Sequence, residues 1–476
     1  MNLKIKILSP IKKICCIGAG YVGGPTMAVI SDHCQEIKVT LVDTDIQKIK
    51  AWNSDNPSRL PIYEPGLEEV VLRNRGKNLF FSTDIKNSIR EADMIFISVN
   101  TPTKIKGLGA GYASDLKWVE SSARQVAKYA DGHTIIVEKS TVPVRTAELI
   151  ENILNESQKM NQDLDKKTFS VLSSPEFLAE GTAIKDLENP DRVLIGGSDK
   201  KAMNLLSSIY KRWIPEEKIL LTNVWSSELS KLIANAFLAQ RVSSINSISA
   251  LCESTGADIK EVVKAIGSDK RIGEKFLSPG PGFGGSCFKK DILNLVYICR
   301  FYGLETVANY WEQILYINVW QKKRISTLII EKFFGTVSNK KIVILGFAFK
   351  SFTNDTRESP AIEIVKDLIE NGANLFINDP KVSALQIEKE IGLKELEIDQ
   401  FSSGSWQFSN DVISSAKDSD AIVLVTEWNE YKEINWKELT ATMRKPAWIF
   451  DTRIIFSKEE LNCLDINYWQ LGTIKD

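Results

Sequence analysis

The chain has 476 residues, which is too long for one compact hydrophobic core, so two or three domains are expected. A formal net charge of −1, from 60 basic and 61 acidic residues, gives no bulk attraction to nucleic acid or to an anionic membrane. The seven cysteines are odd in number and form no CxxC pair, which argues against a disulfide framework and a zinc site. We therefore expect a protein of a reducing compartment, with no metal, nucleic-acid or membrane partner.

The N-terminal sequence MNLKIKILSPIKK interleaves lysines with apolar residues and lacks the apolar region of a secretory signal, so a cytoplasmic location is expected. Only two histidines are present, His33 and His133. Proton transfer in any reaction would therefore fall mainly to lysine, to carboxylates or to water.

Short apolar runs rich in β-branched residues alternate with helical stretches in both halves of the chain. The runs of the first half lie at 13–17, 38–43, 92–102 and 133–143. The runs of the second half lie at 340–350, 374–380, 420–428 and 446–453. This alternation is typical of parallel α/β sheets, and the two series look like weak copies of each other. We predict two Rossmann-like, doubly wound domains, at residues 1–222 and 331–476.

The middle of the chain, residues 223–330, has a helical period and few strand signals. Residues 226–253 carry apolar side chains at helical spacing, and between Ser226 and Gly256 there is neither proline nor glycine. We predict one long helix that joins the two sheet domains, followed by shorter helices. The loop SPGPGFGGSC, which ends at Cys287, interrupts them.

A glycine pattern of the form GxGxxG follows the first strand and opens a helix. Gly18, Gly20 and Gly23 would permit a tight turn, a close approach to a pyrophosphate and close helix packing. Asp43 ends the next strand, where a carboxylate would take the ribose hydroxyls, and Thr44 rather than arginine follows it. The pattern predicts an NAD site, and a glycine turn without a ligand is the less favoured interpretation.

The second glycine-rich segment is the loop at 280–287. Its four glycines would let a ligand lie against the backbone, and Cys287 falls before a predicted helix with Lys289 and Lys290 close by. Such a setting lowers the pKa of a thiol and favours a nucleophilic thiolate. The alternative, a small buried cysteine, suits Cys15 and Cys252 better.

A series of sequence blocks, spread from about residue 11 to about residue 470, carries a family resemblance. The blocks are GAGYVGGP, VNTPT, EKSTVP, SPEFLAEGTA, NPDRVLIGG, ELSKLIANAFLAQR, GFGGSCFKKD, GFAFK and DTRES. In combination they resemble the UDP-glucose/GDP-mannose dehydrogenase family, and within it the UDP-glucose 6-dehydrogenases of animal type. The resemblance implies two Rossmann-like domains joined by a long helix, and a homo-oligomer with a dimer as its minimal unit and a hexamer as a further possibility.

The resemblance also implies the reaction. UDP-glucose, two NAD and water would give UDP-glucuronate and two NADH, by way of a thiohemiacetal and a thioester on Cys287. By resemblance, Lys231 and Asn235 hold the reacting oxygen and a water, and Asp291 is associated with water activation. Glu176 matches a base for thioester hydrolysis, and Thr141 matches a residue that orders water. Without the resemblance, the lysine and the two carboxylates would be taken for ordinary surface or helix-terminal charges.

The contact residues are likewise carried over by resemblance. The predicted NAD contacts are Gly18, Gly20, Tyr21, Val22, Gly23, Asp43, Lys48, Val99, Thr101, Ser140, Thr141, Glu180, Cys287, Lys290 and Arg357. The predicted substrate contacts are Glu176, Phe177, Leu178, Ala179, Glu180, Lys231, Asn235, Arg271, Phe276, Phe283, Gly284, Phe349, Lys350 and Arg453, with Arg271 reaching the substrate of a neighbouring subunit. Two residues depart from the family pattern: Ser278 stands where a lysine is expected, and Lys48 where an arginine is expected.

Three alternatives stay open at this point. The substrate could be another nucleotide sugar, such as a UDP-N-acetylhexosamine or GDP-mannose, with the same chemistry. A simple two-electron dehydrogenase would need no cysteine. A non-catalytic nucleotide-binding or scaffold protein would have no reason to retain Cys287, Lys231, Asp291 and Glu176 together.

Overall fold

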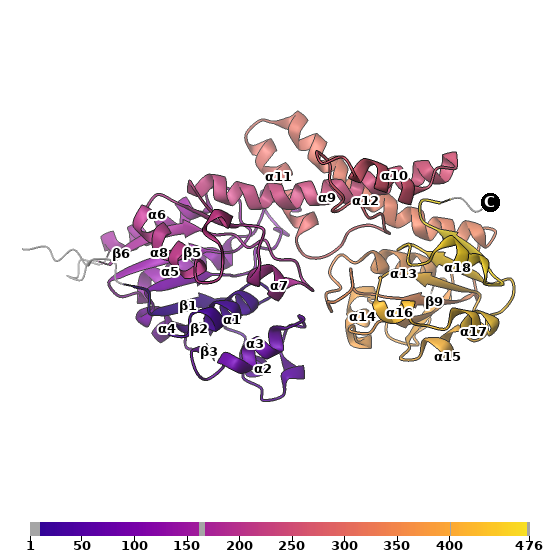
Figure 1. The fold of residues 1–476 in the computed structure, drawn as a ribbon, viewed down its shortest axis with the longest axis horizontal. Coiled ribbons are helices and arrows are strands. Elements are labelled where there is room, and N and C mark those ends of the chain that lie inside the picture. The colour runs from indigo at the N-terminus through magenta and orange to yellow at the C-terminus, as the bar shows by residue number, and fades with distance from the viewer. Residues whose placement is uncertain (1–9, 161–166, 400, 474–476) are drawn as a thin grey trace, which may run out of the picture. The chain divides into compact units, whose positions relative to one another are not determined.

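The computed structural model describes residues 10–160, 167–399 and 401–473. The chain forms two compact units, one made of residues 1–234 and 293–302 and the other of residues 235–292 and 303–476. Each unit is built around one sheet with helices packed against it (Figure 1). The predicted fold class, two doubly wound α/β domains and a long helix, is confirmed.

The first unit contains an eight-stranded sheet in the order β3-β2-β1-β4-β5-β6-β7-β8. Its strands are β1 (Lys13–Ile17), β2 (Lys38–Val42), β3 (Leu79–Ser82), β4 (Met94–Ile97), β5 (His133–Glu138), β6 (Thr168–Ser173), β7 (Val193–Gly197) and β8 (Ile219–Thr222). All neighbours pair in parallel except β6 and β7, which meet over two residue pairs in antiparallel register. The strand order reverses between β1 and β4, and in open α/β sheets ligands bind beyond the carboxyl ends of the strands at such a point.

The helices of the first unit cover both faces of this sheet. They are α1 (Gly23–His33), α2 (Ile46–Trp52), α3 (Leu67–Asn74), α4 (Ile85–Glu91), α5 (Lys117–Tyr129), α6 (Thr146–Met160), α7 (Ala183–Glu188) and α8 (Lys200–Tyr210), with short 3-10 turns at Pro57–Arg59 and Glu216–Lys218. Alternate residues of β1 enter two separate cores. Ile14 and Cys16 pack with Met27 of α1, whereas Cys15 and Ile17 pack with Val126 of α5. Because both faces are covered, the central strands are mostly apolar, and β4 is apolar at every position, as the sequence runs predicted.

The second unit repeats the arrangement with six parallel strands in the order β11-β10-β9-β12-β13-β14. The strands are β9 (Lys341–Leu345), β10 (Asn374–Asn378), β11 (Ser405–Phe408), β12 (Ala421–Leu424), β13 (Trp448–Asp451) and β14 (Asn467–Gln470). The helices after β9 are α13 (Pro360–Glu370), α14 (Ala384–Ile391), α15 (Val412–Ala416), α16 (Asn429–Lys432), α17 (Trp436–Ala441) and α18 (Lys458–Asn462). The order of the four strands around β9 matches that around β1, so the internal similarity seen in the sequence is a similarity of topology.

Helices fill the middle of the chain, as predicted. They are α9 (Val224–Thr255), α10 (Ile259–Gly267), α11 (Phe288–Phe301) and α12 (Glu305–Lys332). The 32-residue α9 begins in the first unit and ends in the second. With 28 residues, α12 is nearly as long, and polar residues inside it, including Asn318 and Gln321, are buried and hydrogen-bonded.

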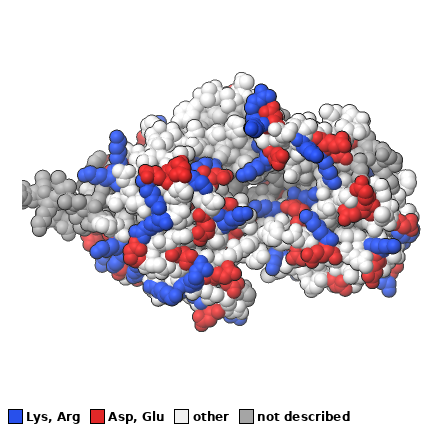
Figure 2. Space-filling view, viewed as in Figure 1, with Lys and Arg blue, Asp and Glu red and all other residues white. Residues whose placement is uncertain are grey.

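Two further properties of the described residues bear on partners. None of the helices in the described ranges combines the length and apolar character needed to cross a bilayer. Acidic and basic side chains are interspersed over the face of the molecule in view (Figure 2), in keeping with the net charge of −1.

Candidate active site

The turn between β1 and α1 uses each of its glycines differently. Gly18 has φ +107°, and a Cβ at this residue would lie 2.2 Å from the Ser98 carbonyl oxygen. A Cβ on Gly23 would lie 2.1 Å from the Gly18 carbonyl oxygen, so α1 starts in contact with the turn. A Cβ on Gly20, by contrast, would meet no protein atom within 4 Å. Two glycines therefore serve the fold, and the third leaves open space before the N-terminus of α1.

Asp43 follows β2 and lies beside this turn. Its Oδ2 accepts hydrogen bonds from the Ala19 N–H at 3.0 Å and from Lys48 Nζ at 2.9 Å, and its Oδ1 accepts one from the Asp45 N–H. Burial alone would raise the pKa of Asp43, but the Asp45 amide and the Lys48 ammonium hold it below its ordinary value. Lys48, which stands where the family pattern has an arginine, thus pairs with Asp43, the residue predicted to bind the ribose. An ionised Asp43, the space over Gly20 and the α1 N-terminus together fit an NAD molecule.

The loops after β4 and β5 are tied together at the same edge of the sheet. Ser140 Oγ donates to the Val99 carbonyl at 2.9 Å, and Thr101 Oγ1 donates to the Thr141 carbonyl at 2.8 Å. All four residues were predicted to lie at the site, and the structure brings them together.

Glu176 lies in the loop after β6, and its carboxylate is bonded on both oxygens. Oε1 accepts from the N–H groups of Phe177 at 2.7 Å and Leu178 at 3.2 Å. Oε2 lies 3.0 Å from Lys139 Nζ, and the Lys139 and Glu176 side chains are only 3% and 13% exposed. Burial alone would raise the pKa of Glu176, but the Lys139 ammonium and the Phe177 amide hold it below its ordinary value.

Lys139 was not among the predicted site residues. Burial alone would lower the pKa of Lys139, but Glu176 and Tyr210 raise it well above its ordinary value, so it stays an ammonium. The signal in the sequence was a lysine directly after the apolar β5 and directly before the predicted Ser140 and Thr141. A charged residue in the innermost part of such a sheet needs a partner.

Two cations flank Phe177 in the first unit. The Arg192 guanidinium carbon lies 3.8 Å from the centre of the Phe177 ring, and Lys231 Nζ lies 5.2 Å from it. Lys231 comes from α9 and is 7% exposed, so it is not the solvated helix residue that its sequence setting alone would favour.

Cys287 stands immediately before α11 in the second unit and is exposed. Its carbonyl accepts the Asp291 N–H at 2.9 Å, and its Sγ lies 3.5 Å from Ser286 Oγ. Lys289, one of the two nearby cations, is bound to the Glu358 carboxylate at 2.8 Å. The α11 N-terminus adds a positive partial charge next to the thiol.

Asn235 and Asp291, which were both predicted, meet inside the second unit. Asn235 Nδ2 donates to Asp291 Oδ2 at 2.6 Å, and Lys290 Nζ lies 3.3 Å from the other carboxylate oxygen. Both Asn235 and Asp291 are buried. The bond joins α9 to the first turn of α11, which carries Cys287 at its start.

Two glycines of the 280–287 loop have a packing role that the sequence did not indicate. A Cβ on Gly284 would lie 2.6 Å from the Glu358 carbonyl oxygen, and one on Gly285 would lie 3.0 Å from the Phe349 ring. The loop is also held by Asn318, which bonds both the N–H and the carbonyl of Phe283. These two glycines make room for close packing against other protein atoms, and the expectation that the loop admits a ligand stays a prediction.

The turn after β9 repeats the turn after β1, but its carboxylate, Asp379, accepts more hydrogen bonds from the protein than Asp43 does. Gly346 has φ +94°, and Asp379 after β10 accepts the N–H groups of Phe347 and Ala348 at 2.7 and 2.9 Å. The same carboxylate also accepts from the Trp428 ring and from two more backbone amides at Lys381 and Val382. Its buried oxygens are fully occupied by protein donors.

Several predicted substrate residues surround this second turn. Arg453 donates to the Phe349 carbonyl at 3.1 Å and pairs with Glu427, and Lys350 Nζ lies 5.6 Å from the Phe349 ring. Arg357 pairs with Asp355, and its carbonyl accepts the Gly285 N–H at 2.7 Å. The GFAFK and DTRES blocks and the cysteine loop thus form one cluster.

Arg271 and Phe276 differ from that cluster. The Arg271 side chain is 89% exposed and pairs with Asp269. Phe276 has φ +62°, a backbone conformation that costs free energy for a bulky residue and is found at functional sites. Its side chain is 42% exposed.

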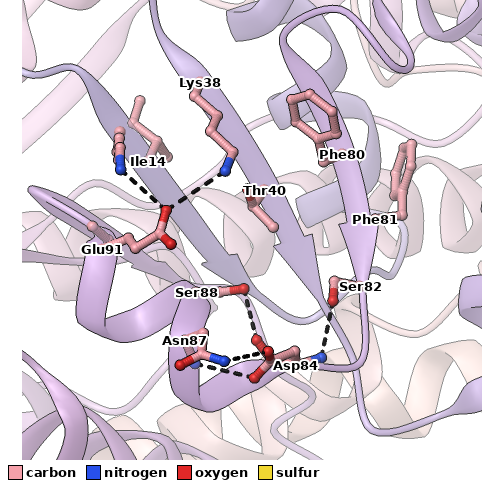
Figure 3. A pocket seen from close by; sticks show the side chains of 12 residues that line it. Ile14, Lys38, Thr40, Phe80, Phe81, Ser82, Asp84, Asn87, Ser88 and Glu91 are labelled. Atoms are coloured by element: carbon pink, nitrogen blue, oxygen red, sulfur yellow. Dashed lines mark hydrogen bonds and ion pairs between the residues drawn. The ribbon is translucent and has the colours of Figure 1, made fainter.

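A hollow of about 360 Å³ lies elsewhere in the first unit, over β1, β2, β3 and α4 (Figure 3). None of the predicted site residues lines it. Its charged groups already have protein partners: Glu91 binds both Lys13 and Lys38 at 3.1 and 3.6 Å, and Asp84 accepts from Asn87. We assign no function to it.

Comparisons with known proteins match the whole chain. Residues 12–214, 225–320 and 343–458 match the NAD binding domain, the central domain and the UDP binding domain of the UDP-glucose/GDP-mannose dehydrogenase family. UDP-glucose 6-dehydrogenase of Gallus gallus is 55% identical over 98% of this chain and 93% of that protein. The enzyme of the same name from Caenorhabditis elegans is 52% identical over 99% of this chain and 97% of that protein.

A solved structure agrees in fold. The UDP-glucose dehydrogenase from the archaeon Pyrobaculum islandicum superposes with a TM-score of 0.81 at 28% identity and covers 100% of both chains. Three family domains in the expected order, and full-length relatives more than half identical, lead to one conclusion. The chain belongs to the UDP-glucose/GDP-mannose dehydrogenase family and uses NAD as its cofactor.

Proposed function

We propose that the protein is a UDP-glucose 6-dehydrogenase, which oxidises UDP-glucose to UDP-glucuronate with two NAD and one water. The observation that carries the proposal is the exposed thiol of Cys287 at the start of α11, in the cluster that holds the GFAFK turn. A dehydrogenase that stops at the aldehyde needs no such nucleophile. The alternative of another sugar is less favoured. The UDP-glucose 6-dehydrogenase of Gallus gallus is 55% identical to this chain, whereas the UDP-D-ManNAc dehydrogenase of Pyrococcus horikoshii is 25% identical.

The chemistry follows from the thiol. NAD accepts one hydride in each of the two oxidation steps. After the first oxidation, Cys287 sulfur adds to the C6 aldehyde and the aldehyde oxygen takes up a proton, which gives a thiohemiacetal. Loss of a hydride and a proton from that adduct leaves a thioester. Water then attacks the thioester carbonyl, the C–S bond breaks, and the carboxylate and the free thiol are released.

The remaining site residues support the same sequence of steps. We propose that Lys231 stabilises negative charge on the C6 oxygen, and that Asn235 and Asp291, joined at 2.6 Å, hold the attacking water. Glu176 would accept a proton from water during thioester hydrolysis, with Thr141 ordering that water. In the second unit Phe349, Lys350 and Arg453 would bind the UDP moiety.

We further propose the domain division 1–222, 223–330 and 331–476, and a homodimer as the minimal assembly. Large apolar side chains stay exposed on the second unit's helices, among them Phe237 and Leu251 of α9 and Tyr316 and Val319 of α12. Exposed apolar side chains mark an interface where they lie close together. All seven cysteines are free, which supports a cytoplasmic location.

The stoichiometry of the reaction tests the proposal. With limiting UDP-glucose, the protein should form two NADH per sugar and UDP-glucuronate as the sole product. UDP-N-acetylhexosamines and GDP-mannose, assayed in parallel by NADH absorbance, should be poor substrates. One NADH per sugar with free aldehyde in solution would refute the four-electron reaction, and faster turnover of another sugar would refute the substrate.

A further inference from the structure

The strongest unassigned feature of the molecule is the buried lysine next to Glu176. Lys139 follows β5, which lies inside the sheet between β4 and β6, and its N–H donates to the Ile97 carbonyl at 3.0 Å. The backbone therefore continues the strand ladder and directs the side chain inward. Its side chain is 3% exposed, and an ammonium is held in such a place only by strong partners.

Those partners are one carboxylate and one phenol, from two other elements of the first unit. Lys139 Nζ lies 3.0 Å from Glu176 Oε2 and donates to Tyr210 Oη at 3.2 Å, and it also lies 5.6 Å from the centre of the Tyr210 ring. Tyr210 ends α8 and is itself buried. The lysine thus fixes the end of the Glu176 side chain to the rigid edge of the sheet.

The geometry of Glu176 leaves it able to act as a base in this position. Oε1 is occupied by two backbone amides, and among the described residues Oε2 accepts from Lys139 and, at the longer distance of 3.5 Å, from Thr26 Oγ1. A carboxylate oxygen offers two lone pairs, so a water molecule that replaces the long Thr26 contact can bond Oε2 beside Lys139.

We propose that Lys139 is the positioning residue for Glu176: as its buried counter-ion, it holds the carboxylate in place and in the ionised form that accepts a proton during thioester hydrolysis. This inference rests on the proposed function, since it concerns the step that releases the acid. In that step water loses a proton to Glu176, its oxygen bonds to the thioester carbon, and the C–S bond to Cys287 breaks. Lys139 gains and loses no bond.

Other charged groups face the pair and contribute less. Lys231 from α9 also lowers the pKa of Glu176, but by less than Lys139 and the Phe177 amide do. The Arg192 guanidinium interacts with the same carboxylate. Cys16 on β1 faces Lys139 but is deeply buried, and burial raises the pKa of its thiol well above the ordinary value. Lys139 combines a 3.0 Å contact with the carboxylate and a side chain that is only 3% exposed.

The test is the pH profile of acid release in Lys139→Met and Lys139→Gln. Without the counter-ion, burial should raise the pKa of Glu176, so the midpoint of the hydrolysis profile should rise by about 1 to 3 pH units. Below that midpoint the rate should fall about tenfold per pH unit, thioester on Cys287 should accumulate in quenched samples analysed by mass spectrometry, and NADH should appear as a burst.

A split between kinetic constants separates this role from a loss of packing. If hydrolysis alone is slowed, kcat and KM should fall together while kcat/KM stays near its original value. Ile209→Val, next to Tyr210 and equally buried, is the matched control: it loosens the same packing and should leave the midpoint unchanged. Lys139→Arg keeps the charge and should keep the midpoint. In a Glu176→Gln background, Lys139→Gln should slow hydrolysis no further.

The outcomes are distinguishable. An unchanged midpoint in a folded Lys139→Gln variant, or additive losses in the double variant, would overturn the role of Lys139 while the unaltered enzyme still forms two NADH per sugar. If the unaltered enzyme forms no UDP-glucuronate, the proposed function itself is wrong. Should Lys139→Met fail to fold, Lys139→Gln still carries the test, because its amide can bond both Glu176 and Tyr210 without a charge.

Discussion

Gly20→Ala should weaken NAD binding while leaving the free protein as stable as before. A Cβ at this residue meets no protein atom within 4 Å, and the backbone is outside the left-handed region, so nothing in the fold opposes the methyl group. Gly→Ala at a compatible position even stabilises by about 0.4 to 1 kcal/mol, through the unfolded chain. The methyl group would instead fill the space before the α1 N-terminus, where we expect the pyrophosphate.

The loss can be estimated. Displacing the phosphate from one backbone N–H removes a hydrogen bond to a charged group, which contributes about 1.5 to 3 kcal/mol. This corresponds to a Kd for NADH about 10 to 150 times higher. Titration by fluorescence or calorimetry gives the Kd, and thermal unfolding without cofactor gives the stability.

Gly18→Ala and Gly23→Ala provide the contrast, because their Cβ atoms would lie 2.2 and 2.1 Å from backbone carbonyl oxygens. Both should lower the unfolding temperature of the free protein. Unchanged NADH affinity in Gly20→Ala, or a fall in its unfolding temperature as large as in Gly18→Ala, would contradict the assignment of this turn.

Four further predictions follow from other residues. Cys287→Ala should bind NAD normally and lose several orders of magnitude in kcat; retained turnover to UDP-glucuronate would exclude the covalent route. Asp43→Ala should narrow the preference for NAD over NADP, measured as the ratio of kcat/KM values, because a carboxylate repels a 2′-phosphate. Arg271→Ala should weaken substrate binding, and dilution below the dimer dissociation constant should abolish activity; an active monomer in sedimentation would end this idea. Burial raises the pKa of Glu228 from 4.5 to about 7, against the amides of Ala147 and Arg145 that lower it. The folded state then binds more protons than the unfolded state between these pH values, so this residue's contribution to stability should decline as pH rises through that window. The difference in unfolding temperature between Glu228→Gln and the unaltered protein should vary across the same window, and a constant difference would contradict the shift.

The parts of the site that could be predicted are those that follow from local sequence. The GxGxxG turn and Asp43 lie within one strand-helix-strand unit, where spacing alone sets their positions. The pair of Lys139 and Tyr210 could not be predicted, because the partners lie 71 residues apart and meet only through the order of strands in the sheet. Nothing in the period of either segment indicates that contact.

The cysteine loop shows the same limit in another form. Its glycines were expected to admit a ligand, and the sequence did not indicate that two of them are also required for close packing inside the protein. The side chains that require them, Phe349 and Asn318, come from the turn after β9 and from α12. Asn318 looks like an ordinary polar position of an amphipathic helix, and only its burial at 6% exposure reveals that it holds the loop.

The second copy of the glycine turn has a consequence for the number of cofactors that the chain binds. A carboxylate has about four lone-pair sites, and in Asp379 these face five donors from the protein itself. A ribose hydroxyl has nothing left to bond there, and Ala348 occupies a fully buried position in the turn. The second unit therefore keeps the strand-turn-helix arrangement of a dinucleotide site, but its carboxylate holds the turn together and is not available to a ribose. Calorimetry should find one NAD per chain.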